Sequence, residues 1–147
     1  MKPSRAGWSA DAQNKDQMVG ERNILLVEDE FLIRFLISES LRDEGYAVLE
    51  ATDGEEGLAV LLSGQPVDLM ITDVRMPGGI DGMELTRRSK ALAPARPVIV
   101  CSGHLMSSEA APADIFLAKP YLADALVKEV TKLMGTAWKT DTQTRSA

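Results

Sequence analysis

Cysteine is almost absent from this chain of 147 residues, since Cys101 is the only one. A single thiol excludes a disulfide framework within the chain and fits a reducing compartment. Long apolar runs are also absent: none approaches the ~20 residues that a membrane-spanning helix needs. The first residues lack the apolar segment of a secretory signal. From these absences we expect a soluble, cytoplasmic protein.

An excess of positive charge is missing as well. The chain has 16 Lys and Arg against 22 Asp and Glu, so its formal net charge is −6 and its pI is about 4.8. This balance disfavours a general binder of the nucleic-acid backbone, which would repel the protein on average. Neither a G-x-G-x-x-G loop nor a Walker A loop is present, which disfavours the common nucleotide-binding domains.

What the sequence does contain is an alternation of short apolar runs with segments of helical periodicity. The expected strands are 23–27, 47–51, 68–72, 97–101 and 115–118. The expected helices are 31–46, which Gly45 should end, and 53–64, 82–92 and 122–134, with Asp53 and Asp81 as N-caps of the second and third. We therefore expect one domain over 23–135, a flexible arm over 1–22 and a flexible tail over 136–147.

Short apolar strands that alternate with helices are typical of an α/β fold. We expect a doubly wound, five-stranded parallel sheet with helices on both faces and a flavodoxin-like strand order of 2-1-3-4-5. The link between the fourth and fifth strands is short and contains Pro112. We therefore expect the fourth helix to be shortened.

Chemically active side chains follow four of the five strands. Glu28 and Asp29 come after the first strand, Asp73 after the third, Ser102 after the fourth and Lys119 after the fifth. In a doubly wound sheet these ends converge on one crevice. Clustered carboxylates without His or Cys favour Mg²⁺, and the lysine would neutralise charge on a phosphoryl group. Asp73 would then be a nucleophile that forms an aspartyl phosphate.

The four motifs resemble those of the response-regulator receiver domain of two-component signalling. They are the acidic pair after "ILLV", the D-x-x-M-P with a following D-G at 73–82, the S-G that ends the fourth strand, and K-P at 119–120. The resemblance covers Asn23 to Gly135. The loop after Asp73 is one residue longer than the commonest form in the family.

The resemblance implies a role for each matching residue. Glu28, Asp29, Asp73 and the backbone carbonyl of Arg75 would bind Mg²⁺. Asp73 would accept phosphate from a sensor histidine kinase or a phosphotransfer protein, and Lys119 would pair with the phosphoryl group. Ser102 and Phe116 would be the switch hydroxyl and the switch aromatic. We also predict that Arg75 and His104 modulate hydrolysis of the acyl phosphate.

The helical patterns predict which faces are buried. In the first helix, Ile33, Leu36, Ile37 and Leu41 form the expected core stripe, and in the last helix Leu122, Leu126, Val130 and Leu133 form another. Phe31, Leu32 and Phe35 lie off the first stripe, beside the expected crevice. We interpret these three residues as a docking patch for a kinase.

The function that fits these features is a stand-alone, phosphorylatable receiver, and not an enzyme beyond slow removal of its own phosphate. About a dozen polar residues after Gly135 are too few for a DNA-binding domain. Output would then pass through protein contact, or the chain would be a phosphate shuttle or sink. Two alternatives stay open: a receiver-like scaffold that is never phosphorylated, and an aspartyl-phosphate hydrolase. Arg75 weighs against the hydrolase, because those enzymes typically have aspartate at that position.

Overall fold

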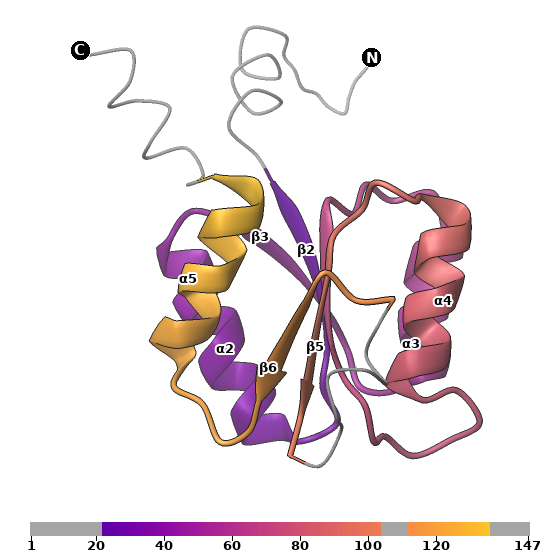
Figure 1. The fold of residues 1–147 in the computed structure, drawn as a ribbon, viewed down its shortest axis with the longest axis horizontal. Coiled ribbons are helices and arrows are strands. Elements are labelled where there is room, and N and C mark those ends of the chain that lie inside the picture. The colour runs from indigo at the N-terminus through magenta and orange to yellow at the C-terminus, as the bar shows by residue number, and fades with distance from the viewer. Residues whose placement is uncertain (1–21, 104–111, 136–147) are drawn as a thin grey trace, which may run out of the picture.

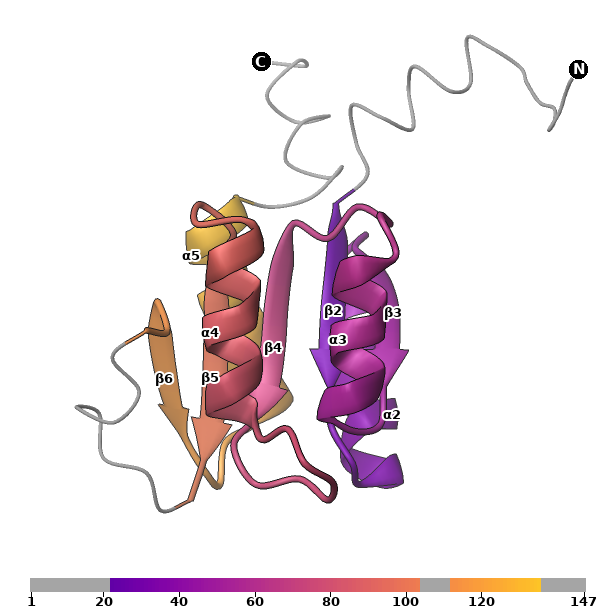
Figure 2. The same ribbon diagram turned by 90° about the vertical axis from the view of Figure 1, so that its right-hand side faces the viewer.

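The computed structural model describes residues 22–103 and 112–135, which contain a five-stranded parallel sheet. Its strands are β2 (Asn23–Val27), β3 (Ala47–Ala51), β4 (Leu69–Asp73), β5 (Val98–Ser102) and β6 (Ile115–Ala118). The spatial order β3-β2-β4-β5-β6 is the predicted 2-1-3-4-5; Figure 1 gives the fold, and Figure 2 shows the strands in this order. All strands run in the same direction, so they end at one edge of the sheet, which we call the carboxyl edge.

Helices cover both faces of the sheet, as expected. The described residues contain α2 (Phe31–Asp43), α3 (Gly54–Leu62), α4 (Gly82–Leu92) and α5 (Ala123–Met134). Helices α2 and α5 pack on one face, and α3 and α4 lie on the other (Figures 1 and 2). The shortened fourth helix was expected within a link whose residues 104–111 lie outside the described part of the chain, as do positions 1–21 and 136–147.

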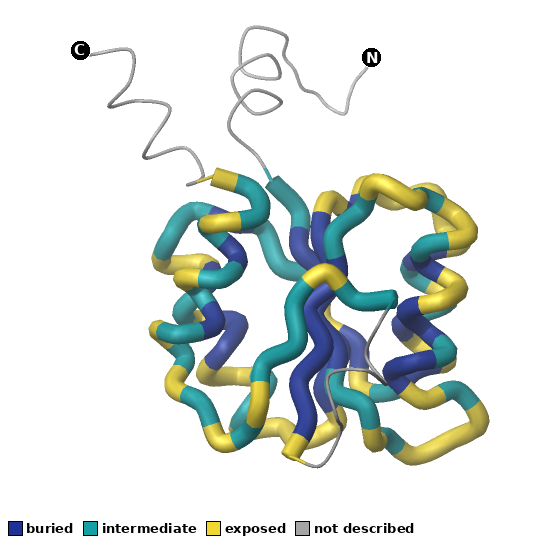
Figure 3. Tube along the Cα trace, in the orientation of Figure 1, coloured by how far each residue is buried: buried dark blue, intermediate teal, exposed yellow. Residues whose placement is uncertain are grey.

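The core consists of two apolar clusters, one on each face of the sheet. Alternate residues of β2 divide between them: Ile24 and Leu26 join the α2–α5 cluster, and Leu25 and Val27 join the α3–α4 cluster. Strands buried on both faces are near-continuous apolar runs, and the sequence pattern therefore predicts them well. Figure 3 shows the buried strands in the centre, between helices that carry buried and exposed residues on different sides.

Two predicted helix caps are present in the structure. The Asp53 carboxylate accepts a hydrogen bond from the Glu56 amide at 2.8 Å, and the Asp81 carboxylate accepts one from the Glu84 amide at 2.9 Å. Each satisfies an amide that the first turn of a helix leaves unpaired. Gly45 follows α2 with φ 98°, a left-handed conformation that favours glycine and ends the helix.

Some boundaries and faces differ from the prediction. Strands β4 and β5 begin and end one residue later than expected, and α2 ends at Asp43. Leu36, predicted to be buried, is 59% exposed, and Leu122 is 76% exposed because it precedes the first turn of α5. Ile37 and Leu41 are buried, as are Leu126 and Val130. The buried stripes are therefore narrower than the apolar spacing suggested.

The first and last described residues meet at the edge of the sheet opposite the carboxyl edge. The Arg22 guanidinium donates a hydrogen bond to the Met134 carbonyl at 3.1 Å. The Tyr46 hydroxyl donates one to the Gly135 carbonyl at 2.9 Å. Among the described residues, no helix is long and apolar enough to cross a membrane.

Candidate functional site

Strand register places Asp73 and Glu28 side by side at the carboxyl edge. Val27, the last residue of β2, pairs with Thr72 of β4, so Glu28 and Asp73 follow at the same level. The apolar residues before them are almost fully buried, which fixes both strands in the sheet. The rigid part of the fold therefore aims these two carboxylates into one place.

Three carboxylates gather at this point. Glu28, Asp29 and Asp73 each offer an oxygen, and these oxygens lie within 4.8 Å of one another. Glu28 is 3% exposed, whereas Asp29 is exposed. Oxygen donors without a sulfur or imidazole ligand are the set that hard divalent cations prefer. The donor chemistry thus fits the predicted cation.

Lys119 lies between two of these acids, although it is distant from both in sequence. Its ammonium is 2.9 Å from Asp73 Oδ2 and 3.7 Å from Glu28 Oε1. Burial alone would lower the pKa of Lys119, but its hydrogen bond to Asp73 and the nearby Glu28 outweigh that effect, and the pKa is raised. Lys119 therefore stays charged and holds Asp73 Oδ2 in place.

The electrostatics of Glu28 are those of a crowded, buried acid. Burial raises its pKa to about 6, and the Asp73 and Asp29 charges add to the rise. The Glu30 amide, which donates to Glu28 Oε2 at 3.0 Å, and the charge of Lys119 oppose it. The uncompensated negative charge favours the arrival of a cation.

The loop after Asp73 folds back closely on the strand. The Gly82 amide donates to the Val74 carbonyl at 2.8 Å, and a Cβ on Gly82 would lie 1.9 Å from the Asp73 carbonyl oxygen. Only glycine fits there. Farther out, the Gly79 amide donates to the Glu55 carboxylate at 2.8 Å, which ties the loop to α3. The D-G pair is visible in the sequence, whereas these contacts are not.

The remaining predicted site residues occupy neighbouring strands and the loop. Ser102 is buried at the end of β5. Phe116 lies in β6, paired with Val100, and packs against the α3–α4 cluster. Arg75 is exposed in the loop after Asp73, and His104 lies outside the described residues. Their assigned roles stay predictions.

Sequence reasoning missed one residue that contacts the loop between β2 and α2. Arg34 of α2 donates a hydrogen bond from Nη1 to the Glu28 carbonyl at 2.8 Å. No pattern singled it out, because an arginine on an amphipathic helix usually faces solvent.

Comparison with known proteins agrees with this geometry. The family model of the response regulator receiver domain matches residues 24–131. Transcriptional regulatory protein GlrR of Escherichia coli (strain K12) is 37% identical over 113 residues, which are 74% of this chain and 25% of that protein. Sporulation initiation phosphotransferase F of Bacillus subtilis (strain 168) is 30% identical over 122 residues, which are 80% of this chain and 96% of that protein. The chain thus spans a quarter of one relative and nearly all of the other.

Solved structures give the same result. Response regulator protein TrrA from Thermotoga maritima, in complex with Mg²⁺ and BeF, superimposes with a TM-score of 0.70 and 34% identity. The match covers 77% of this chain and 99% of that one. The receiver domain of the hybrid histidine kinase CckA matches with a TM-score of 0.65 and 37% identity, over 76% of this chain and 98% of that one.

Proposed function

The chain belongs to the response regulator receiver family, the phosphoacceptor domains of two-component systems, and on that premise we propose that Asp73 accepts the phosphoryl group. The donor would be a phosphohistidine on a sensor kinase or a phosphotransfer protein. The observation that carries the proposal is the position of Lys119, whose ammonium lies 2.9 Å from Asp73 Oδ2 while two further carboxylates lie alongside. The arrangement places a nucleophile, Asp73, next to the positive charge of Lys119 and next to the carboxylates that would bind a cation.

The chemistry follows from this arrangement. An Asp73 carboxylate oxygen attacks phosphorus, the bond from phosphorus to the donor nitrogen breaks, and the imidazole keeps the electron pair and remains protonated on its other nitrogen. Lys119 then exchanges part of its contact with Asp73 for a contact with a phosphoryl oxygen. Phosphoryl transfer depends mainly on positioning and charge stabilisation, so a site without an evident proton-transfer base is sufficient.

The cation of the site is proposed to be Mg²⁺. Glu28, Asp29, Asp73 and the backbone carbonyl of Arg75 would hold it, and it would supply positive charge to the phosphoryl oxygens. The all-oxygen donor set of the three carboxylates supports this choice. So does the presence of Mg²⁺ in the similar protein TrrA.

Switching is proposed to involve Ser102 and Phe116. The Ser102 hydroxyl, at the end of the strand beside β4, would move toward the new phosphoryl oxygen. Phe116, half-buried on the next strand, would turn into the vacated space. Such a pair converts a local charge change into a shape change at the surface.

The donor is proposed to dock on α2. Phe31, Leu32 and Phe35, the predicted docking patch, are all exposed, and the Phe31 and Phe35 rings are 6.2 Å apart. Beside them lies a pocket of about 390 Å³ between α2 and the loop before α5, with Leu36, Pro120 and Tyr121 in its lining. Lys119 lines the same pocket, so a docked donor would approach the site.

Downstream of phosphorylation, we propose that the domain signals by protein contact or passes the phosphoryl group on, without turnover of other substrates. The match along 96% of a sporulation phosphotransferase supports the second route.

The test is intact mass spectrometry after incubation with acetyl phosphate and Mg²⁺. We expect one added phosphoryl group on the wild type and none on Asp73→Asn. Asp124→Asn is the matched control, since Asp124 is exposed in the first turn of α5, and it should be modified like the wild type. An unmodified wild type would instead favour the scaffold. Turnover of a generic phosphomonoester would favour the hydrolase.

A further inference from the structure

We propose that Arg34 is a positioning residue for the cation site, and that it acts through the backbone of Glu28 rather than through its charge. The inference rests on the proposed function, since it assigns a role toward the cation of that same site. It concerns a side chain that contacts none of the three carboxylates of the acidic cluster in any described hydrogen bond or ion pair.

The amide and the carboxylate of Glu28 are held by hydrogen bonds to the backbone of neighbouring segments, and its carbonyl remains to be paired. Its amide donates to the Ala51 carbonyl at 3.0 Å, which continues the pairing of β2 with β3. Its Oε2 accepts from the Glu30 amide at 3.0 Å. After Glu28 the chain leaves the sheet, so no strand partner is available for its carbonyl. The Arg34 guanidinium fills that place at 2.8 Å.

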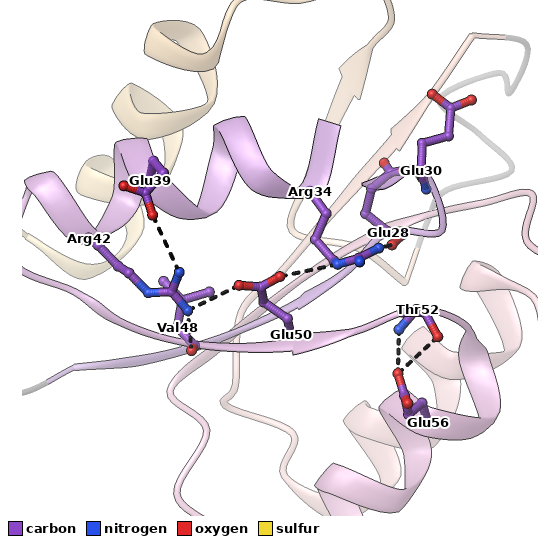
Figure 4. Close-up of polar contacts among 9 residues, drawn as sticks. All are labelled: Glu28, Glu30, Arg34, Glu39, Arg42, Val48, Glu50, Thr52 and Glu56. Carbon is purple, nitrogen blue, oxygen red and sulfur yellow. Dashed lines mark hydrogen bonds and ion pairs between the residues drawn. The ribbon is translucent and has the colours of Figure 1, made fainter. Parts of the chain in front are cut away.

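Arg34 is itself anchored. Its Nε lies 3.1 Å from Oε1 of Glu50 on β3, and its side chain is only 13% exposed. The other Glu50 oxygen is 3.1 Å from the Arg42 guanidinium, which also donates to the Val48 carbonyl at 3.1 Å. Figure 4 shows this row from Arg42 through Glu50 and Arg34 to Glu28. The edge strand thereby braces the peptide group that joins Glu28 to Asp29.

The orientation of that peptide group matters because both neighbouring residues carry a carboxylate of the cluster. A rotation of the plane would move Glu28 and Asp29 apart from Asp73. Groups that orient metal ligands without touching the metal typically change metal affinity 10–100-fold when they are replaced. Only a guanidinium can reach Glu50 through one nitrogen and the Glu28 carbonyl through another in a fixed fork.

Replacing Arg34 distinguishes this role from an effect of charge. A positive charge near a cation site repels the cation, so its removal in Arg34→Gln would tighten Mg²⁺ binding if charge were the whole effect. Positioning predicts the opposite sign. Arg34→Lys keeps the charge and loses the fork, and positioning predicts that it also weakens binding.

The experiment is isothermal titration calorimetry of the unphosphorylated protein with Mg²⁺ alone. We expect Kd to rise about tenfold in Arg34→Lys and in Arg34→Gln. Arg42→Lys is the matched control: it alters a guanidinium on the same helix that pairs with the same Glu50 carboxylate, but Arg42 does not contact Glu28, and Kd should stay within about twofold. Glu50→Ala, which frees Arg34, should weaken binding in the same direction and gives a second reading if an Arg34 variant fails to fold.

Equal or tighter Mg²⁺ binding by Arg34→Lys and Arg34→Gln would overturn the inference. The proposed function has a separate readout: a wild type that neither binds Mg²⁺ nor takes a phosphoryl group from acetyl phosphate removes it. A wild type that does both, with Arg34 variants that match it, removes only the role of Arg34.

Discussion

At the scale of single residues, Glu28 shows how the fold tolerates the mutual repulsion of the three carboxylates. It is the most buried acid of the cluster, and its carboxylate pairs with the Lys119 ammonium at 3.7 Å. That distance is too long for a strong hydrogen bond, so the ion pair compensates only part of the cost of burial. A site of this kind stores unfavourable free energy that a bound cation can relieve.

The pKa of Glu28 gives a prediction with a definite sign. On folding, this pKa rises from its ordinary value of 4.5 to about 6. The folded state therefore binds the proton more tightly, and stability falls as the pH rises from about 4.5 through about 6. The full cost above that range is about 2 kcal/mol. Glu28→Gln, which cannot ionise, should raise the free energy of unfolding by about 1–2 kcal/mol at pH 8 without divalent cations.

Urea unfolding in EDTA at pH 8 and near pH 4.5 measures this difference. The gain should fall to less than about 0.5 kcal/mol at the lower pH, where the folded-state carboxyl is protonated and the unfolded-state carboxyl is half protonated. Glu30→Gln, which alters an exposed carboxylate two residues away, should change stability by less than about 0.5 kcal/mol at either pH. A Glu28→Gln protein that is less stable than the wild type at pH 8 would contradict the prediction.

At the scale of elements, α5 shows how narrow a buried helix face can be. Leu126 and Val130 are fully buried in the α2–α5 cluster, whereas Leu122, four residues before Leu126, is exposed. Leu126→Ala should destabilise the protein by about 2–5 kcal/mol, because it leaves a cavity as well as losing apolar burial.

Leu122→Ala is the matched comparison for that change. It removes the same atoms from an exposed position and should cost less than about 0.5 kcal/mol. Denaturant unfolding of both variants measures the contrast. Equal losses would mean that Leu122 packs on the core after all.

The same contrast explains how far the sequence predicts this fold. Buried parallel strands are continuous apolar runs, so all five were predicted to within one residue. Helix faces were predicted less well, because periodicity gives a spacing and not the width of the contact. Leu36 has the right spacing but lies at the margin of the buried face, while Ser38, which is small and polar, is fully buried.

The candidate site likewise has a part that the sequence predicts and a part that it does not. Its carboxylates and Lys119 were predicted because side chains at strand ends follow from topology. The contacts of Arg34, Glu55 and Gly82 could not be, because each depends on how a loop or helix packs on the sheet. Side-chain hydrogen bonds to loop backbone leave no periodic pattern in a sequence.

At the scale of the whole molecule, the exposed apolar residues bear on partner choice. The proposed docking patch lies on α2, and a comparable exposed leucine, Leu62, lies on α3 on the other face of the sheet. If the donor binds α2, Phe35→Asp should slow phosphoryl transfer from a phosphorylated histidine kinase at least about tenfold, because a buried charge in the interface is costly.

Leu62→Asp should leave that transfer unchanged, and acetyl phosphate, which needs no docking, should modify both variants at the wild-type rate. Radiolabel transfer from purified kinases, using the one that phosphorylates the wild type fastest, measures all three proteins. Full-rate transfer to Phe35→Asp would dismiss the docking patch.

The hydrogen bonds of Arg22 with Met134 and of Tyr46 with Gly135 determine where a tag attached to the domain would lie. The five-residue strands hold these bonds roughly 15 Å away from Asp73. A tag, a dye or a sensor-chip tether joined at either end of the domain would therefore be attached on the side of the sheet opposite the carboxyl edge. In a protein immobilised that way, the site formed by Glu28, Asp29 and Asp73 would still be accessible to a binding partner in solution.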